Sequence, residues 1–337
     1  MKQLVIINNE SVFSDSSFFF CDNISIKSIS EGLSKNFKTL IILRNSKVPR
    51  SHQINLGKIV LASNLFAFLF KIFKTFKEKD TKYLIISITP YTFFAYLLLF
   101  IFRKEVSIYL RSDGYEEYRA IFGFIGPFIY HIMYFFVTFK SNVIVCDKNL
   151  VKKKKCELVY PSELDMHWFK DTTKPLLDKP RLLFVGRIKV EKGIFSLIKI
   201  LNEMISDYEL TIVGKSSSLS LQNKKINHLG YINNVDKLIK AYDNNNILIL
   251  PSFTEAYPQV INESLARFRP VILFEEIRHV VFNRQGIFVT KRDAKSLSQT
   301  INFVINNYSN IQENMTKNKL PTKEEFILRM TDILGLR

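Results

Sequence analysis

The sequence predicts an α/β protein with two doubly wound domains, each built on a parallel sheet that helices cover on both faces. Short apolar runs of strand length alternate with longer helical segments through both halves of the chain. These runs are apolar throughout, which indicates strands that are buried on both faces. At 337 residues, with 47% hydrophobic and 23% charged residues, the chain is long enough for two globular domains of ordinary size.

The first domain is expected to span residues 1–168. Its strands are predicted at six apolar runs, residues 4–7, 39–43, 58–62, 83–88, 106–110 and 142–146, and crossover helices are predicted at 24–36 and 65–77. Wound at the helical angle, residues 65–82 place Leu65, Leu69, Ile72, Phe73 and Phe76 on one face and Lys71, Lys74 and Lys82 on the other. This pattern favours an amphipathic helix over a core, and a basic face on an anionic membrane is the alternative.

A polar segment with two prolines, residues 169–180, is expected to link the domains. The second domain is expected at residues 181–321, with strands near Leu182, Leu210, Ile247, Val271 and Ile287 and helices near Phe195, Val235, Pro258 and Leu297. The final segment, 322–337, carries apolar residues at helical spacing and is predicted to form a helix.

The segment 253–270 combines the start of a helix with two carboxylates. Pro258 suits the first helical position, because its missing N–H would be unpaired there anyway. Glu255 precedes the helix and Glu263 lies one and a half turns inside it. A helix N-terminus favours a bound anion, so Glu255 can reach the polar part of such a ligand while Glu263 faces another part. The alternative is that Glu255 helps to cap the helix and Glu263 is a solvated surface residue.

A second motif follows the strand near Leu182. The chain has Gly186 and Arg187 at the end of this strand and Lys192, followed by a second glycine, five residues later. Glycine lets the backbone approach a ligand, and the two cations can hold phosphate groups. The alternative is a pair of exposed cations at the start of a helix.

Taken together, the Gly-Arg pair, the Lys-Gly pair and the two glutamates separated by seven residues resemble the C-terminal half of group 1 glycosyltransferases. These are retaining nucleotide-sugar enzymes with the GT-B fold. Residues 209–214, 228–231 and 248–252 follow in the order that the family shows, so the resemblance covers about residues 180 to 290. It implies two Rossmann-like domains that face a central cleft, with the terminal helix, 322–337, packed back toward the N-terminal domain.

The resemblance also implies roles for individual residues. Arg187 and Lys192 would hold the donor diphosphate, and Glu255 would engage the hydroxyls of the donor sugar. The other donor-binding positions that it implies are Gly186, Gly230, Tyr231, Ala256, Tyr257, Pro258 and Glu263. Among these, Glu263 would bind the nucleotide ribose, and Gly230 and Tyr231 would border the base. The family usually has glycine where this chain has Ala256, so the backbone approach is expected to differ there.

The acceptor side is expected in the first domain. Arg111, Ser112 and Asp113 follow the strand predicted at 106–110, at the carboxyl edge where open α/β sheets place ligands. Many members of the family carry a histidine near this point, and here Arg111 or Asp113 would have to serve. The alternatives are a turn-forming Asp113 and a structural Arg111.

The formal net charge of +17 would attract nucleic acid, an anionic membrane or a phosphorylated substrate. Residues 120–139 contain no Asp, Glu, Lys or Arg, but glycines, a proline and a histidine interrupt the run. A span there would separate strands of the first sheet, so a buried or interfacial helix is predicted instead. The three cysteines lack metal-ligand spacing, and the chain start resembles a first strand more than a signal peptide.

The principal hypothesis is a retaining, hexosyltransferase-type glycosyltransferase that moves a sugar from a nucleotide-diphosphate donor to a surface polysaccharide, lipopolysaccharide or lipid-linked glycan. It is expected to be cytoplasmic and peripheral at the inner face of an anionic membrane, without nucleic acid as a partner. Neither a cofactor nor a metal is expected, since the chain has no Asp-x-Asp signature.

Three alternatives remain. One is a relative of the same fold with epimerase or phosphorylase activity. Another is a basic protein that binds nucleic acid or membranes without catalysis. A dinucleotide oxidoreductase is disfavoured, because the first strand–helix turn, predicted at residues 8–11, lacks a G-x-G-x-x-G run.

Overall fold

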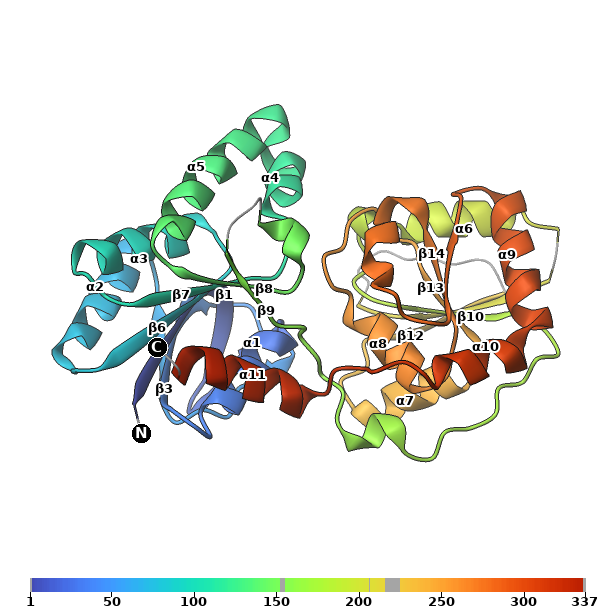
Figure 1. The fold of residues 1–337 in the computed structure, drawn as a ribbon, viewed down its shortest axis with the longest axis horizontal. Coiled ribbons are helices and arrows are strands. Elements are labelled where there is room, and N and C mark those ends of the chain that lie inside the picture. Colours follow the sequence, from blue (N-terminus) through green and yellow to red (C-terminus); the bar gives the residue numbers. More distant parts are fainter. Residues whose placement is uncertain (1, 152–154, 206, 216–224, 336–337) are drawn as a thin grey trace. The chain divides into compact units, whose positions relative to one another are not determined.

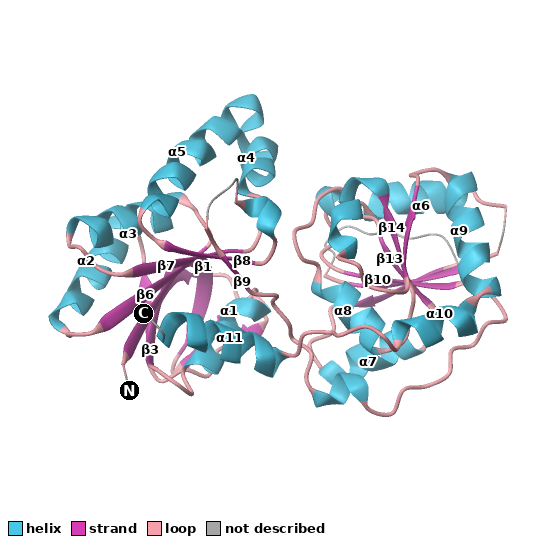
Figure 2. Cartoon of the chain, in the orientation of Figure 1, coloured by secondary structure: helices cyan, strands magenta, loops and turns pink. Residues whose placement is uncertain are grey.

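The computed structural model describes residues 2–151, 155–205, 207–215 and 225–335 (Figure 1). The chain forms two compact units. The first unit combines Met1–Glu163 with Lys323–Arg337, and the second unit is Leu164–Thr322. Each has a central sheet with helices around it (Figure 2).

The main strands of the first unit run parallel. Their order across the sheet is β5 (Ile59–Ala62), β3 (Lys38–Ser46), β1 (Gln3–Asp15), β6 (Thr81–Ile86), β7 (Val106–Leu110), β8 (Asn142–Val145) and β9 (Glu157–Leu158). Each of the six predicted apolar runs lies in one of these strands, as expected for segments buried on both faces. The strand order reverses between β1 and β6.

Strand β1 is longer than predicted, and the turn expected at residues 8–11 is wrong because β1 continues to Asp15. The register with β3 shifts between Ile7 and Ser11, which marks a bulge, and the side chain of Asn8 donates to the carbonyl of Ile86 at 2.7 Å. The extension pairs antiparallel with β2 (Phe18–Cys21), which pairs antiparallel with β4 (His52–Gln53). An antiparallel ribbon therefore adjoins the predicted parallel sheet.

Helices cover both faces of the first sheet. They are α1 (Ile24–Leu33), α2 (Leu65–Lys74), α3 (Pro90–Ile101), α4 (Gly114–Phe122), α5 (Gly126–Phe139) and α11 (Lys323–Gly335), and the short 3-10 helices are η1 (Thr75–Lys77), η2 (Gly123–Ile125) and η3 (Lys148–Leu150). Successive strand side chains point to opposite faces, so Ile108 packs into the core under α2, α3 and α5 while Tyr109 contacts Phe326 of α11. Helix α11 lies so close to α1 that a Cβ at Gly32 would be only 2.5 Å from the side chain of Ile327.

Helix α2 buries only part of the face that its periodicity predicts, with Ile72 buried and Leu69 and Phe76 half-buried against the core. Phe68 and Ile72 are its buried residues, whereas Phe73, expected in the core, is exposed together with Phe66 and Phe70. The two buried residues are four positions apart, and Ala67 and Leu69 beside them pack half-buried against the same core. The other aromatic residues of α2 lie outside this contact and stay at the surface.

The stretch Gly114–Phe139 is apolar and long enough to cross a membrane by length and composition alone, but it is not one straight helix. The chain breaks at Gly123, where φ is 62°, and α4 turns back onto α5. A Cβ at Gly126 would lie 1.9 Å from the carbonyl oxygen of Tyr118. Helix α5 has 14 residues and is therefore about 21 Å long, less than the ~30 Å of a bilayer core.

The second unit is built on a parallel sheet. Its order is β12 (Ile226–Gly230), β11 (Glu209–Val213), β10 (Arg181–Val185), β13 (Ile247–Leu250), β14 (Val271–Phe274) and β15 (Ile287–Thr290). Its helices are α6 (Ile194–Asn202), α7 (Val235–Asp243), α8 (Gln259–Ala266), α9 (Ala294–Asn306) and α10 (Tyr308–Met315), and its 3-10 helices are η4 (Met166–Phe169), η5 (Val190–Lys192) and η6 (Glu275–Val281). The strand order reverses between β10 and β13, because the chain moves outward through β11 and β12 before it returns to β13.

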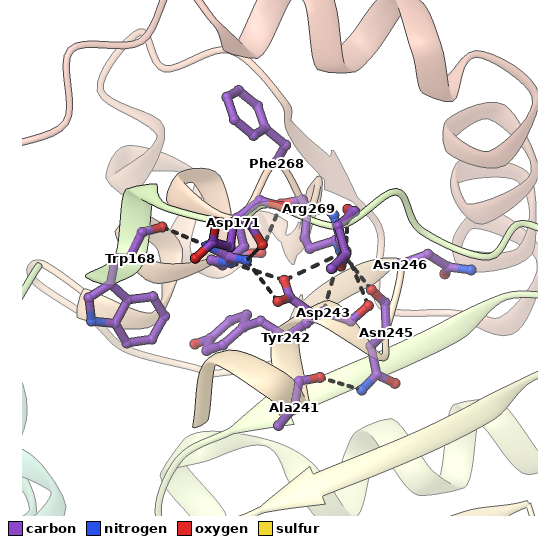
Figure 3. A network of polar contacts seen from close by, with 12 residues as sticks. Trp168, Asp171, Ala241, Tyr242, Asp243, Asn245, Asn246, Phe268 and Arg269 are labelled. Carbon is purple, nitrogen blue, oxygen red and sulfur yellow. Dashed lines mark hydrogen bonds and ion pairs between the residues drawn. The ribbon is translucent and has the colours of Figure 1, made fainter. Parts of the chain in front are cut away.

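Residues 164–180 belong to the second unit, whereas the sequence predicts residues 164–168 in the first domain and 169–180 as a linker. Figure 3 shows the polar network that holds this segment. The buried guanidinium of Arg267 donates to the carbonyls of Trp168 and Asp171 and to the carboxylate of Asp243, at 2.7 to 3.1 Å. Arg269 donates to Thr173 at 3.0 Å. Buried cations need acceptors on all sides, and the extended segment supplies its carbonyls.

Candidate functional site

The candidate site lies where the strand order of the second sheet reverses. The connection after β10 covers residues 186–193, and the connection after β13 covers residues 251–258. Because β10 and β13 are neighbouring parallel strands, both connections leave the sheet at the same edge. Ligands of open α/β sheets bind outside the carboxyl ends of the strands at such a reversal.

The two connections touch each other through their backbones. Gly193 has φ of 69°, and a Cβ there would lie 1.8 Å from the carbonyl oxygen of Pro251. The backbone N–H of Phe253 donates to the carbonyl of Glu191 at 3.0 Å. Only glycine allows both the left-handed conformation and this close approach at position 193.

The side chains of Lys192 and Glu255 join the two connections. Lys192 Nζ lies 2.5 Å from Glu255 Oε1, and the side chains are 20% and 11% exposed. The hydroxyl of Ser252 donates to the same carboxylate oxygen at 2.7 Å. Two of the three residues predicted to be catalytic therefore meet, and the cation and the carboxylate are held in fixed positions.

Arg187, the third predicted residue, is on the same connection as Lys192 and is exposed. Within the described part of the chain its guanidinium makes no hydrogen bond or ion pair. The preceding Gly186 donates its N–H to the carbonyl of Val213 at 2.9 Å. Arg187 is thus a cation without a protein partner among the described residues, carried on the same connection as Lys192.

Glycines mark the ends of three adjacent strands, β10, β11 and β12. Gly214 follows β11, and a Cβ there would lie 2.0 Å from the carbonyl oxygen of Gly186. Gly214 donates its N–H to the carbonyl of Gly230 at 2.9 Å, and Gly230 has φ of 72°. The predicted donor-binding residues Gly186 and Gly230 thus belong to one row of strand ends, and Tyr231 follows as an exposed side chain.

Glu263 is held by a neighbouring helix. The hydroxyl of Tyr242, on α7, donates to Glu263 Oε2 at 2.7 Å. Burial raises the pKa of Tyr242 well above its ordinary value, and the adjacent Glu263 carboxylate raises it further, so this hydroxyl stays a donor. Glu263 is therefore an oriented carboxylate and not a freely solvated one.

The predicted start of α8 is off by one residue. Pro258 has an extended ψ of 117° and is the N-cap, so the helix begins at Gln259. Ala256 is buried, and the hydroxyl of Tyr257 accepts a hydrogen bond from Asn262 at 3.3 Å. The residues between Glu255 and the helix are packed in place.

Sequence reasoning missed two residues that brace the turn after β13. The guanidinium of Arg292 lies 4.1 Å from the ring centroid of Phe253 and donates to the carbonyl of Pro251 at 3.0 Å. His279 Nε2 donates to the carbonyl of Glu255 at 2.7 Å. Arg292 follows β15 by two residues, so the strand-end rule that selected Arg111 could have found it, whereas His279 has no such signal.

A pocket of about 300 Å³ lies at the carboxyl ends of β6 and β7 in the first unit. Arg111 and Ser112 line it, and Tyr118 and Tyr130 of the α4–α5 hairpin form its apolar side. Asp113 instead caps α4 by accepting from the N–H groups of Tyr115 and Glu116 at 2.9 and 3.3 Å. Of the three predicted acceptor-side residues, two line the pocket and one has the turn-forming role given above as the alternative.

Among the residues that the structure describes, no group of three or more His, Cys, Asp or Glu side chains is arranged to hold a metal ion.

Residues 168–320 match the family described as glycosyl transferases group 1. An uncharacterized glycosyltransferase of Methanocaldococcus jannaschii is 24% identical over 217 residues, which cover 53% of this chain and 54% of that protein. A putative teichuronic acid biosynthesis glycosyltransferase of Bacillus subtilis is 28% identical over 132 residues, which cover 37% of this chain and 33% of that protein. The matches thus span about half and about a third of the lengths of these relatives.

The fold has close counterparts among solved structures. HepE of Anabaena, in complex with UDP and glucose, superimposes with a TM-score of 0.72 over 99% of this chain and 100% of that chain, at 14% identity. The chain has the GT-B fold, and the predicted fold class is confirmed.

Proposed function

We propose that the chain, whose residues 168–320 match the group 1 glycosyltransferase family, transfers a hexosyl group from a nucleotide-diphosphate sugar with retention of configuration. The proposed acceptor is a surface polysaccharide, a lipopolysaccharide or a lipid-linked glycan. The observation that carries the proposal is the contact of Lys192 with Glu255 at the reversal of the second sheet. The UDP and glucose bound to HepE, and the teichuronic acid in the name of the Bacillus relative, support this donor and acceptor.

The leaving group defines what the site has to do. Cleaving the bond between an anomeric carbon and a nucleoside diphosphate adds negative charge to the phosphate and leaves an oxocarbenium-like sugar. Fixed cations stabilise that charge in the transition state. Lys192 supplies a compact charge held in place by Glu255, and Arg187 supplies a planar group for two oxygens.

The two glutamates hold the rest of the donor. Glu255 accepts hydrogen bonds from hydroxyls of the sugar, and its orientation is fixed by Lys192 and Ser252. Glu263, fixed by Tyr242, accepts hydrogen bonds from the ribose. The packed turn after Glu255 presents backbone groups of Ala256 and the residues that follow it to the phosphates.

Retention needs no catalytic base from the protein in this proposal. The oxygen of the leaving phosphate takes the proton of the attacking acceptor hydroxyl while that hydroxyl bonds to the anomeric carbon on the same face. The proposal includes no metal ion, because Lys192 and Arg187 stabilise the diphosphate.

The acceptor binds in the pocket of the first unit, where Arg111 holds an anionic group and Ser112 holds a hydroxyl. The chain works in the cytoplasm, at the inner face of the membrane.

A donor screen tests the proposal. The purified chain is incubated with nucleotide-diphosphate sugars that differ in base and sugar, and release of free nucleoside diphosphate is measured with and without acceptor glycan. One donor is expected to stabilise the protein against thermal unfolding and to release nucleotide faster with acceptor. Folded protein that responds to no donor would contradict the proposal.

The same screen separates the alternatives. An epimerase would change the sugar of the donor without an acceptor, and a phosphorylase would need inorganic phosphate. A basic binding protein would bind random RNA in a salt-sensitive manner that survives the double variant R187Q/K192Q. The matched control is K199Q/K295Q, which removes two exposed lysines of the second unit. Only R187Q/K192Q is expected to abolish donor binding.

A further inference from the structure

The α4–α5 hairpin of the first unit exposes an unusual amount of apolar surface. Phe124, at its tip, is 90% exposed, and Ile121 and Phe128 beside it are about two-thirds exposed. One side of α5 is buried through Tyr130, Met133 and Val137, whereas its other side carries exposed aromatic residues. Exposed apolar patches of this size on a folded domain mark a surface that binds a protein, a membrane or a ligand.

The apolar surface continues from the hairpin over α3 to α2. These helices lie on one side of the first sheet, with α1 and α11 on the other side (Figure 1). Phe93 of α3 contacts Phe136 of α5 with ring centroids 6.3 Å apart, and Phe102, just after α3, contacts Phe73 of α2 at 5.4 Å. We name the exposed side of α2, α3, α4 and α5 the apolar face.

Every charged residue along three stretches of this face is positive, whereas the first turn of α4 carries Glu116 and Glu117. Residues 65–77, 90–104 and 120–140 contain six cations, Lys71, Lys74, Lys77, Arg103, Lys104 and Lys140, and no aspartate or glutamate. Several of these lysines lie over aromatic rings. Lys74 Nζ is 4.6 Å from the ring centroid of Phe70, and Lys104 Nζ is 5.0 Å from that of Phe76. Aromatic rings interleaved with lysines fit the boundary between acyl chains and anionic headgroups.

We infer that the apolar face docks on an anionic lipid bilayer, with the tip of the α4–α5 hairpin inserted among the lipids. The inference specifies the surface for the membrane contact in the proposed function, and it does not depend on the donor chemistry. The occupant is a bilayer and not a second copy of the chain, because a two-fold contact would bring the lysines of this face against their own copies. Because the chain breaks at Gly123, we infer that the hairpin inserts into the bilayer without spanning it.

Docking in this way would bring lipid next to the acceptor pocket. Ile121 and Phe122 of the hairpin line that pocket together with the cation of Arg111 and the carboxylate of Glu117. A docked hairpin therefore places the apolar side of the pocket at the bilayer surface and leaves Arg111 to meet a phosphate. The acceptor class that fits is a glycan joined through phosphate to a long apolar chain.

Vesicle binding tests the inference with the full chain and no donor. The protein is sedimented with vesicles of phosphatidylcholine alone or with one third phosphatidylglycerol. Binding is expected only to the anionic vesicles and is expected to weaken at high salt. The variant K74Q/K77Q/K104Q is expected to bind about a hundredfold more weakly, since each lysine near an anionic surface contributes about a fivefold factor. The control K199Q/K237Q/K295Q removes three exposed lysines of the second unit and is expected to bind like the wild type.

The apolar part is tested at the hairpin tip. F124S/F128S is expected to lower vesicle affinity at least about tenfold. V48S/L328S, which changes two exposed residues outside the apolar face, is expected to leave it unchanged. The emission of F124W is expected to shift to the blue on anionic vesicles, and that of L328W is not.

Three outcomes would overturn the inference. These are equal binding to neutral vesicles, full binding by F124S/F128S, and a wild-type dimer that F124S/F128S dissociates without any vesicle binding. Donor hydrolysis with a water-soluble acceptor is expected to be unchanged in F124S/F128S. Loss of vesicle binding can therefore be distinguished from failure of the proposed transferase activity.

Discussion

The two units share a parallel sheet whose strand order reverses once, but they hold their charges differently. In the second unit two cations are fixed by partners, Lys192 by Glu255 and the buried Arg267 by Asp243, whereas Arg187 is exposed. In the first unit the guanidinium of Arg111 makes no hydrogen bond or ion pair among the described residues, and an apolar face with lysines lies exposed. The family match covers residues 168–320, which is nearly the second unit alone.

The difference follows from what each unit is proposed to bind. A nucleoside diphosphate has fixed geometry, so its site needs particular side chains held at fixed positions. A bilayer has no fixed geometry, so its surface needs only apolar residues and positive charge. The proposed ligand of the second unit is therefore inferred from specific residues. The proposed membrane contact of the first unit is inferred only from the composition of its surface.

The sharpest test of this contrast is E255Q. It keeps the shape of the side chain but removes the charge that fixes Lys192 and that is proposed to bind the sugar, so kcat is expected to fall about a thousandfold, or about 4 kcal/mol. Initial rates with the donor found in the screen measure this effect. E313Q, at an exposed position on α10, is the control. R111Q, in the first unit, is expected to act mainly on the KM for acceptor, and full activity of E255Q would remove Glu255 from the site.

The buried ion pair of the second unit can be compared with an exposed one of the first. R267M leaves the carboxylate of Asp243 and the carbonyl of Trp168 without their donor, and is expected to destabilise the second unit by about 3–5 kcal/mol. Urea unfolding followed by fluorescence reports on this unit, because Trp168 is the only tryptophan and is buried in the second core.

R329M is the matched change in the first unit, where Arg329 pairs with Glu157 at the surface. It is expected to destabilise the first unit by less than about 1 kcal/mol, measured by circular dichroism because Trp168 lies in the second unit. Equal effects of R267M and R329M would show that the network of Figure 3 does not hold residues 164–180 in place.

The contact between the two connections of the second unit depends on one glycine. G193A places a Cβ against the carbonyl of Pro251 in a left-handed backbone, so we expect a loss of about 2 kcal/mol and reduced transferase activity. In the first unit, the Cβ that G57A adds has no heavy atom of a non-neighbouring residue within 4 Å. This variant is expected to change the free energy of unfolding by less than about 0.5 kcal/mol. Thermal unfolding and initial rates of both variants check this, and a fully active G193A would contradict the geometry.

The smallest expected effect is that of replacing Glu163, the last residue of the N-terminal segment of the first unit. Burial raises the pKa of this carboxyl, although Lys323, 3.3 Å away, and Ser28 lower it in part. A raised folded-state pKa means that the folded state holds the proton more tightly, so stability falls as the pH rises from the unfolded pKa through the folded one. E163Q is expected to unfold at the same temperature as the wild type near pH 4 and at a slightly higher temperature at pH 7. A difference that does not change with pH would contradict this assignment.

Local patterns in the sequence predicted much of the fold. The six apolar runs of the first half form strands, because a segment buried on both faces must be apolar throughout. The motifs around Arg187, Lys192 and Glu255 could be found because glycine, proline and charge at strand ends are local features. Their shared position also follows from strand order, since the carboxyl ends of parallel neighbours meet at one edge.

Tertiary structure decided what depends on distant neighbours. Tyr242 orients Glu263, and Arg292 and His279 brace the turn before α8, although all three are far from these partners in sequence. Periodicity showed that α2 has an apolar side, but the width of its contact with the core determined that Phe66 and Phe73 stay exposed. Residue spacing alone determined most of the strands and helices, but not the extension of β1 to Asp15 or the ribbon of β2 and β4. Only the folded chain determined which polar groups pair and which apolar side chains remain uncovered, because both depend on packing between segments far apart in the chain.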